Sequence, residues 1–242
     1  RDKGPVATEG DVAGEGEEDF EVGMRQNAME RDAADADADG KLDYLARGKV
    51  LGGSSSINGM VYMRGQRQDY DLWAQMGCRG WSYEEVLPYF RKAEKNQRGA
   101  NEFHGADGPL EVSDLRDVPP LYNAFLAAGQ EMGMPLNPDF NGAEQEGIGL
   151  TQTTTGGGRR KSTGQVYLKP ARRRPNLKVE TNARGHRVLF EGKKAVGYAY
   201  FQNGEPKEAR ANREVILCGG AYGSPQLMLS LIHISEPTRP NC

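Results

Sequence analysis

The stretch Arg47–Gly65, RGKVLGGSSSINGMVYMRG, joins a polar glycine-rich loop to an apolar segment. Two adjacent glycines, Gly52 and Gly53, let the backbone adopt positive φ and approach a ligand without a Cβ in the way. The serines behind them offer hydroxyl and N–H groups, and Asn58 adds an amide that donates and accepts. Such a loop is typical of a backbone held against a cofactor. On spacing alone, a serine-rich turn before a core helix is an equally good interpretation, because glycine-rich loops are weak signals.

The residues downstream of this loop predict a mixed α/β (α+β) fold. An apolar block directly after the loop is expected to be buried: Ile57, Met60, Val61, Tyr62 and Met63. Helices are predicted where apolar residues recur at helical spacing, with Ser82 as an N-cap and Gly77 as a C-terminal stop. The predicted helices cover residues 69–76, 83–94 and part of 119–133. In the third helix the side chains expected to be buried are Leu121, Phe125, Leu126, Ala128 and Met132.

Strands are predicted where apolar and β-branched residues run between turn residues. They cover residues 110–112, 151–155, 176–180, 185–190, 195–201 and 213–218. Asn203-Gly204 is a strong hairpin turn. The continuous apolar run at 213–218, REVILC, is typical of a buried strand of a parallel sheet. Small residues follow it at the start of a predicted helix, a geometry that contacts dinucleotides.

Composition and charge exclude several classes of protein. With 37% hydrophobic residues, 27% charged residues and a mean hydropathy of −0.72, the chain is polar for a self-sufficient globule. It has no run of about 18 apolar residues that could span a membrane, and its start lacks the apolar region of a signal peptide. We therefore expect a cytoplasmic protein or a membrane-peripheral one of bacterial type.

The charge is unevenly distributed along the chain. Residues 1–46 hold 14 acidic and 5 basic side chains, giving −9, and the remainder carries +6. A positive body suits an anionic cofactor such as a dinucleotide without identifying one. Residues 1–38 are acidic, low in complexity and without apolar periodicity, so we expect them to be disordered or not native to the fold.

Cysteine and histidine usage argues against disulfides and metals. The cysteines are few and widely spaced, which indicates reduced or buried thiols: Cys78, Cys218 and Cys242. The histidines are also far apart and no cysteines are paired, so no metal site is expected: His104, His186 and His233. His104 lies between glycines and acids, where a solvated or hydrogen-bonded loop residue is more common than a catalytic base.

A basic cluster at residues 159–163, RRKST, admits several interpretations. Cations beside hydroxyls could bind phosphate, and Arg172–Arg174 could extend the cluster toward nucleic acid. The cluster lacks interleaved aromatic residues and any nucleic-acid-binding motif. A solvated basic loop is therefore the favoured interpretation, and no nucleic-acid partner is expected.

The segment Gly48–Asn58, with Tyr62, Gly65 and Asp71 after it, resembles the first signature of the glucose–methanol–choline (GMC) flavin oxidoreductases, and within them the choline dehydrogenase-like members. The resemblance implies an incomplete FAD-binding domain with part of the substrate or cap region. Some relatives attach the flavin covalently through a His where this chain has Ile57. The resemblance therefore implies FAD held without a covalent bond.

The resemblance also implies the cofactor-binding residues. In the family the first loop lies against the isoalloxazine, Gly185 stands where relatives touch the adenine side, and the segment from Gly219 is similar to the second signature, G-A-x-x-S-P-x-L-L. The implied residues are Gly52, Gly53, Ser54, Ser55, Asn58, Gly59, Gly185, Gly219 and Gly220. A further family pattern, G-x-R-x-S-T-A, is matched by Gly158, Arg160, Ser162 and Thr163, with Gly164 in place of Ala.

Two parts of the family pattern are missing from the sequence. No G-x-G-x-x-G motif for the FAD pyrophosphate occurs, and the region that bears the family's catalytic His is absent, so no catalytic residue is predicted. From Leu231 onward the tail has no family counterpart and looks like a translated sequencing adapter. The expected organisation is an acidic segment at 1–38, a GMC N-terminal region at 39–230 and an artefactual tail at 231–242.

The resemblance implies an FAD-dependent alcohol dehydrogenase that oxidises a CH–OH group by hydride transfer to FAD. Its partner would be a small-molecule alcohol. The residues do not specify the electron acceptor or any membrane association. We expect the chain by itself to be inactive. The alternatives are a non-enzymatic basic binding module and an assembly fragment that is never expressed.

Overall fold

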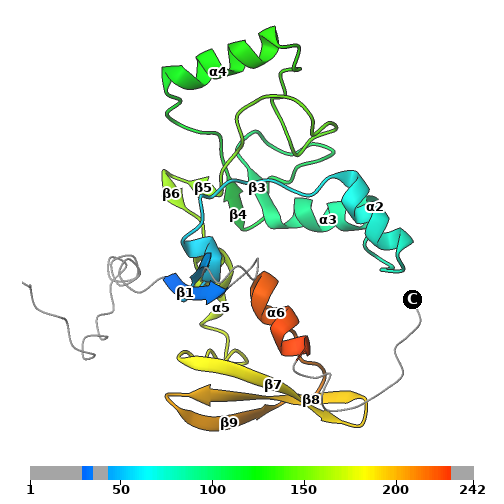
Figure 1. Cartoon of the computed structure of the whole chain (residues 1–242), viewed down its shortest axis with the longest axis vertical. Coiled ribbons are helices and arrows are strands. Elements are labelled where there is room, and N and C mark those ends of the chain that lie inside the picture. The colour runs from blue at the N-terminus through cyan, green and yellow to red at the C-terminus, as the bar shows by residue number, and fades with distance from the viewer. Residues whose placement is uncertain (1–28, 35–42, 230–242) are drawn as a thin grey trace, which may run out of the picture. The chain divides into compact units, whose positions relative to one another are not determined.

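The computed structural model describes residues 29–34 and 43–229 (Figure 1). The chain divides into two compact units, residues 1–173 and 174–242, which are described separately. The predicted artefactual tail, residues 231–242, lies outside the described residues. Within the described ranges every helix is too short or too polar to traverse a lipid bilayer.

The first unit opens with a two-stranded ribbon. Strand β1 (Met29–Ala34) pairs antiparallel with β2 (Asp43–Gly48). Six residues of the acidic segment, for which disorder was one expectation, therefore form a strand. The other expectation, that residues 1–38 are not native to the fold, stays a prediction. The rest of that segment lies outside the described residues.

After β2 the chain enters the short 3₁₀ helix η1 (Gly53–Ser56) and then continues to residue 66 without regular structure, apart from one β-bridge at Val61. The alternative of a serine-rich turn before a core helix is therefore wrong. The block expected to be buried is only partly so, because Val61 and Met63 are exposed. In a segment without regular structure, consecutive side chains do not share one face, so a continuous apolar block does not bury all its members.

Two helices confirm the capping signals in the sequence. Helix α2 (Arg67–Gln75) is followed by Gly77 at φ 102°, and α3 (Tyr83–Ala93) begins with a capping box between Ser82 and Glu85. Both ends lie within a residue or two of the predicted ones. The buried core of this pair consists of Tyr70, Tyr83 and Val86, with Leu87 and Phe90 packed against it.

The rest of the first unit is built from short elements. Strand β3 (Glu94–Asn96) pairs in parallel with β4 (Leu110–Val112). The bounds of β4 are those of the strand predicted at 110–112. The remaining elements are α4 (Pro120–Glu131), β5 (Thr155–Gly156), β6 (Arg159–Arg160), η2 (Gly164–Leu168) and α5 (Lys169–Ala171). Most of the strand predicted at 151–155 is reduced to bridges from Thr153 to Val61 and Ser113.

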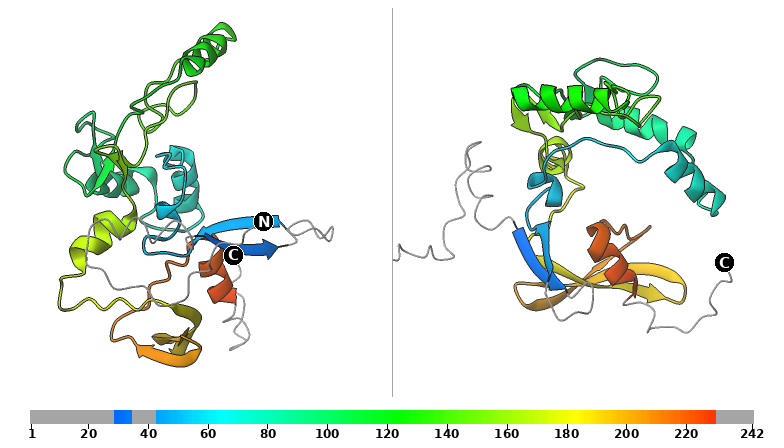
Figure 2. Two further views of the ribbon diagram at one scale, coloured as in Figure 1. Left: turned by 90° about the vertical axis from the view of Figure 1, so that its left-hand side faces the viewer. Right: turned by 45° about the horizontal axis from the view of Figure 1, so that its top comes forward.

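The second unit is a three-stranded antiparallel sheet with one helix (Figure 2). Strands β7 (Ala183–Glu191), β8 (Lys194–Gln202) and β9 (Glu205–Arg210) follow one another in order. The predicted hairpin turn is confirmed, with Asn203 at φ 53° and Gly204 at φ 86°. Helix α6 (Gly220–Leu229) contacts β7.

Three predictions about packing and strands are wrong. Residues 176–180 and 213–218 have no regular structure, and Ile216 is 73% exposed. A buried parallel strand needs neighbouring strands to receive its backbone hydrogen bonds, and the described residues provide none at 213–218. Helix α4 forms as predicted, yet Leu121 and Phe125 in the helix and Met132 directly after it are exposed, because no described element covers them.

Candidate functional site

The glycine–serine loop, residues 52–59, presents one glycine inward and one outward. Gly52 and Gly53 lie in the left-handed region, at φ 91° and 55°. A Cβ added to Gly52 would lie 2.7 Å from Ser56 Oγ and 2.8 Å from the backbone N of Gly164. A Cβ added to Gly53 or Gly59 would meet nothing within 4 Å. The loop therefore packs against the protein at Gly52 and leaves open space over Gly53.

The serine hydroxyls close the loop on itself. Ser55 Oγ donates to Gly52 O over 2.5 Å, and Ser56 Oγ donates to Leu51 O over 2.9 Å. Ser54 Oγ accepts from the backbone N–H of Gly48 at 3.2 Å. These hydroxyls hold the backbone of the loop in its left-handed turn, so the open face of the loop is made mainly of backbone.

A second segment, residues 159–164, forms the wall behind the loop. Thr163 donates its N–H to Ser55 Oγ over 3.0 Å and its hydroxyl to Gly52 O over 3.1 Å. Arg160 Nη1 donates to Ser55 O over 3.1 Å and to Asn58 Oδ1 over 2.7 Å. The loop conformation is thus fixed by residues about a hundred positions away in the chain.

The basic cluster at 159–163 is therefore mostly not a solvated loop. Arg160 holds the glycine–serine loop, Lys161 pairs with Glu111 at 3.0 Å, and Ser162 is buried; Arg159 alone of the three cations is exposed. Arg160 and Thr163 were not among the predicted site residues. The available signal was their match to the G-x-R-x-S-T-A pattern.

The residue after the loop is strained. Met60 has φ 63°, an unfavourable conformation for a side chain of its size. Its N–H donates to Asn58 Oδ1 over 3.2 Å, an Asx turn, and its carbonyl accepts from Thr154 N at 2.8 Å. Two separate anchors therefore keep the chain in a bend that costs of the order of 1–3 kcal/mol.

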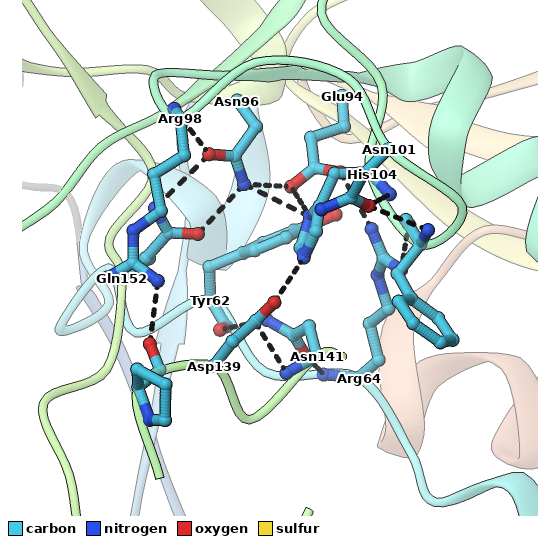
Figure 3. Close-up of polar contacts among 12 residues, drawn as sticks. Tyr62, Arg64, Glu94, Asn96, Arg98, Asn101, His104, Asp139, Asn141 and Gln152 are labelled. Atoms are coloured by element: carbon cyan, nitrogen blue, oxygen red, sulfur yellow. Dashed lines mark hydrogen bonds and ion pairs between the residues drawn. The ribbon is translucent and has the colours of Figure 1, made fainter. Parts of the chain in front are cut away.

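The chain that leaves the loop is held by a buried polar cluster (Figure 3). We call it the His104 network; its members are Arg64, Glu94, Asn96, His104, Asp139, Asn141 and Gln152. Arg64 Nη2 lies 2.7 Å from Glu94 Oε2, and His104 Nδ1 lies 2.9 Å from Glu94 Oε1. His104 Nε2 lies 2.9 Å from Asp139 Oδ2. Two cations and two carboxylates thus neutralise one another.

This network perturbs the acid–base behaviour of its members. Burial alone would lower the pKa of His104, but its hydrogen bonds to Asp139 and Glu94 outweigh burial and raise the pKa to about 9. Burial opposes ionisation of Glu94, yet hydrogen bonds from His104 and Asn96 and the charge of Arg64 lower its pKa. The hydrogen bond from His104 is the main reason why the pKa of Asp139 is lowered. Near neutral pH His104 is therefore a cation.

The sequence favoured either a solvated or a hydrogen-bonded loop residue at His104. The side chain is hydrogen-bonded and only 3% exposed, so it is not solvated. Both of its ring nitrogens face carboxylate oxygens. The imidazolium can donate to both, whereas a neutral ring could donate to only one. Because both ring nitrogens are hydrogen-bonded to carboxylates, His104 stabilises the local structure.

The network connects directly to the chain after the loop. Asn141 accepts from the N–H of Arg64 at 2.8 Å and donates to the carbonyl of Tyr62 at 3.0 Å. The N–H of Tyr62 donates to Gln152 O over 2.9 Å. The backbone from Met60 to Arg64 is therefore clamped on both sides, which fixes where the loop ends.

The other predicted cofactor residues belong to the second unit and are described by themselves. A Cβ at Gly185 would overlap the Tyr198 hydroxyl, so this glycine lets a tyrosine pack on the sheet. Gly219 N donates to Ser224 Oγ over 2.9 Å, and Gly220 begins α6 at φ 79°. The structure brings Gly52, Gly53, Ser54, Ser55, Asn58 and Gly59 together in one loop.

The two glycines at the start of the loop are expected to respond differently to substitution. Gly52→Ala adds a Cβ that overlaps Ser56 and the backbone of Gly164, so it should lower the free energy of unfolding by about 2–4 kcal/mol. Gly53→Ala faces open space and should cost only about 1 kcal/mol, the penalty of its left-handed backbone. Urea unfolding of the two variants measures the difference. Equal destabilisation would contradict the inward packing of Gly52.

Comparisons with known proteins identify the family to which the chain is similar. The family model described as GMC oxidoreductase matches residues 20–231, beginning earlier than the expected residue 39. Human mitochondrial choline dehydrogenase is 51% identical over 191 residues, covering 79% of this chain and 32% of that protein. An oxygen-dependent choline dehydrogenase of Chromohalobacter salexigens is 49% identical over 193 residues, covering 78% and 35%. The chain thus spans about a third of the length of these relatives.

Solved structures show the same fold. Pyridoxine 4-oxidase from Mesorbium loti superposes with a TM-score of 0.75 at 33% identity, over 83% of this chain and 40% of that chain. A formate oxidase from Aspergillus oryzae RIB40 matches with a TM-score of 0.72 at 23% identity, over 86% and 38%. The second likeness concerns the fold alone.

Proposed function

Because the chain belongs to the GMC oxidoreductase family, we propose that its glycine–serine loop lies against FAD and that the complete protein oxidises a small alcohol of the choline type. GMC oxidoreductases are FAD-dependent enzymes that act on CH–OH groups, and their N-terminal domain, which this chain matches, holds the FAD site. FAD supplies the hydride acceptor when it is bound.

The observation that carries the proposal is the open face of the loop. Gly53 and Gly59 have no atoms within 4 Å of an added Cβ, so a flat ring can approach the backbone there. Asn58 is exposed beside them and offers a polar side chain to the edge of such a ring. Ile57 has no nucleophilic atom, which supports a non-covalent cofactor. These residues fit FAD.

The contacts of the loop residues indicate the role of each one in the proposed site. Gly52 and Thr163 hold the loop on its inner side, and Gly53 leaves room for the flavin ring. Asn58 offers hydrogen bonds to the polar edge of that ring. The His104 network keeps the following chain in place. The identities near 50% to choline dehydrogenases support a small alcohol such as choline as the substrate.

The proposed FAD site is tested by placing a bulky side chain over the open face of the loop. In the complete protein, Gly53→Leu should weaken FAD binding tenfold or more, because the added side chain occupies the space over the loop. Gly192→Leu is a matched control: Gly192 has φ 60° and also nothing within 4 Å, but it lies in the β7–β8 turn. Titration of the apoprotein with FAD provides the dissociation constants. Equal FAD affinity in both variants would contradict the site.

Activity is tested separately from binding. The complete protein should oxidise choline with an artificial electron acceptor, whereas the 242-residue chain alone should not, since no described residue is assigned as the base. FAD binding without choline turnover would overturn the substrate and leave the cofactor site standing. Turnover by the chain alone would overturn its expected inactivity.

The alternative of a basic binding module has less support. Arg160 and Lys161 are engaged within the protein, which leaves Arg159 as the exposed cation of the three. Salt-sensitive binding of nucleic acid by the chain would favour this alternative.

A further inference from the structure

The contacts of Asn58 decide which way its amide faces. Arg160 Nη1 lies 2.7 Å from one amide atom of Asn58, and the N–H of Met60 lies 3.2 Å from the same atom. A guanidinium and a backbone N–H are both donors and cannot accept. That atom must therefore be the oxygen, and the amide nitrogen of this exposed side chain carries its two N–H groups on the side away from Arg160. Among the described residues, none accepts from that nitrogen.

Arg160 reaches Asn58 because a tight hairpin delivers it. Strands β5 and β6 pair Thr155 with Arg160 across a turn in which Gly157 and Gly158 have φ 60° and 77°. This turn type requires left-handed backbone at both positions and sends β6 straight back along β5. The side chain of Arg160 then lies behind the glycine–serine loop, and its Nη1 is shared between Asn58 and Ser55.

Arg160 keeps its positive charge uncompensated by a local carboxylate. Its neighbour Lys161 pairs with Glu111 at 3.0 Å, but no described carboxylate forms an ion pair with Arg160. Its guanidinium instead contacts a backbone carbonyl and an amide oxygen, which are neutral. A cation that binds the oxygen of an amide also polarises the amide and strengthens its N–H groups as donors.

We propose that Arg160 is a positioning residue that fixes the Asn58 amide with both N–H donors toward the cofactor and places a net positive charge behind the loop. This inference rests on the proposed FAD site. Donors on the open side of the loop and a cation behind it both stabilise negative charge on a ring placed against the loop. The site therefore favours the electron-rich state of its cofactor.

The test uses the complete FAD-loaded protein and two arginine variants. Arg160→Gln should lower the midpoint potential of the flavin and raise the dissociation constant of sulfite tenfold or more. Sulfite adds to the oxidised flavin through its own electron pair, and the electron pair of the opened ring π bond carries negative charge onto the ring. The addition needs no leaving group and no external oxidant. For a two-electron couple a tenfold effect corresponds to about 30 mV. Arg159→Gln removes the same charge from the exposed neighbour and should leave both values unchanged.

A third variant separates the amide from the arginine. Asn58→Ala removes the outward N–H donors without adding a charge and leaves Arg160 in place, so it should weaken sulfite binding in the same direction. If Arg160→Gln fails to retain FAD, this variant still tests whether the Asn58 amide donates to the cofactor. Wild-type potential and sulfite affinity in the FAD-bound variants would overturn the inference alone. A complete protein that binds no FAD would overturn the proposed function as well.

Discussion

Glu94→Gln is expected to lower the free energy of unfolding by about 3–5 kcal/mol, the cost of breaking a buried ion pair from one side. Glu94 is 0% exposed and accepts from Arg64, His104 and Asn96. The glutamine has nearly the same shape, so little packing changes. The charge is lost, however, so Arg64 loses its carboxylate partner and His104 keeps only Asp139. Urea unfolding of the chain, followed by circular dichroism, measures the loss.

A surface ion pair provides the matched control. Arg67 and Glu84 lie 2.6 Å apart, but their side chains are 49% and 70% exposed. Glu84→Gln makes the same chemical change in water and should cost less than about 1 kcal/mol. If the two glutamine variants lose the same stability, the His104 network does not hold the first unit together.

The second large effect is a loss of stability at alkaline pH. The pKa of His104 is raised from 6.5 to about 9, so the folded state holds this proton more tightly than the unfolded state. The corresponding stabilisation is fully present below pH 6.5 and is lost as the pH rises through 9. A shift of this size corresponds to roughly 3 kcal/mol. Unfolding free energies measured at pH 6.5 and above pH 9 should differ by an amount of this order.

Histidine variants identify the group responsible. His104→Gln should remove most of the alkaline decline, whereas His186→Gln, at an exposed position of β7, should retain it. On the acidic side the sign is reversed, because the pKa values of Glu94 and Asp139 are lowered. Their stabilisation is present above pH 4.5 and is lost as the pH falls below it. An alkaline decline that persists in His104→Gln would assign it to another group.

Local signals in the sequence were sufficient where the structure is local. Ser82 and Gly77 mark helix ends through contacts with residues a few positions away, and the Asn203-Gly204 turn needs only its own two backbone conformations. At Gly52–Gly53 the local signal was sufficient for the backbone turn, although distant residues hold the loop in place. Its left-handed turn follows from the absence of side chains at two positions.

Predictions failed where an element depends on a distant partner. The run at 213–218 has the composition of a buried strand, yet a strand forms only when neighbours accept its backbone hydrogen bonds. The apolar face of α4 has the right periodicity, but burial needs a second surface. Periodicity shows which side chains share a face and does not supply what covers it.

The site shows the same limit. Arg160 stands in a basic cluster whose composition suggested solvation, and only its contact with Asn58 reveals its role. The His104 network is equally hidden, because Arg64, Glu94, His104 and Asp139 come from four separate segments. The sequence offered one pointer to Arg160, a spaced pattern shared with a family, and none to the network.

The wall behind the glycine–serine loop has a consequence for the order of folding. Ser55 and Thr163 are separated by 108 residues, and Asn58 and Arg160 by 102. During synthesis the loop leaves the ribosome long before the residues that hold it, and closing so large a segment is slow. The site is therefore assembled late, after the locally capped helices. Loss of the Arg160 contact should accelerate unfolding far more than it slows folding.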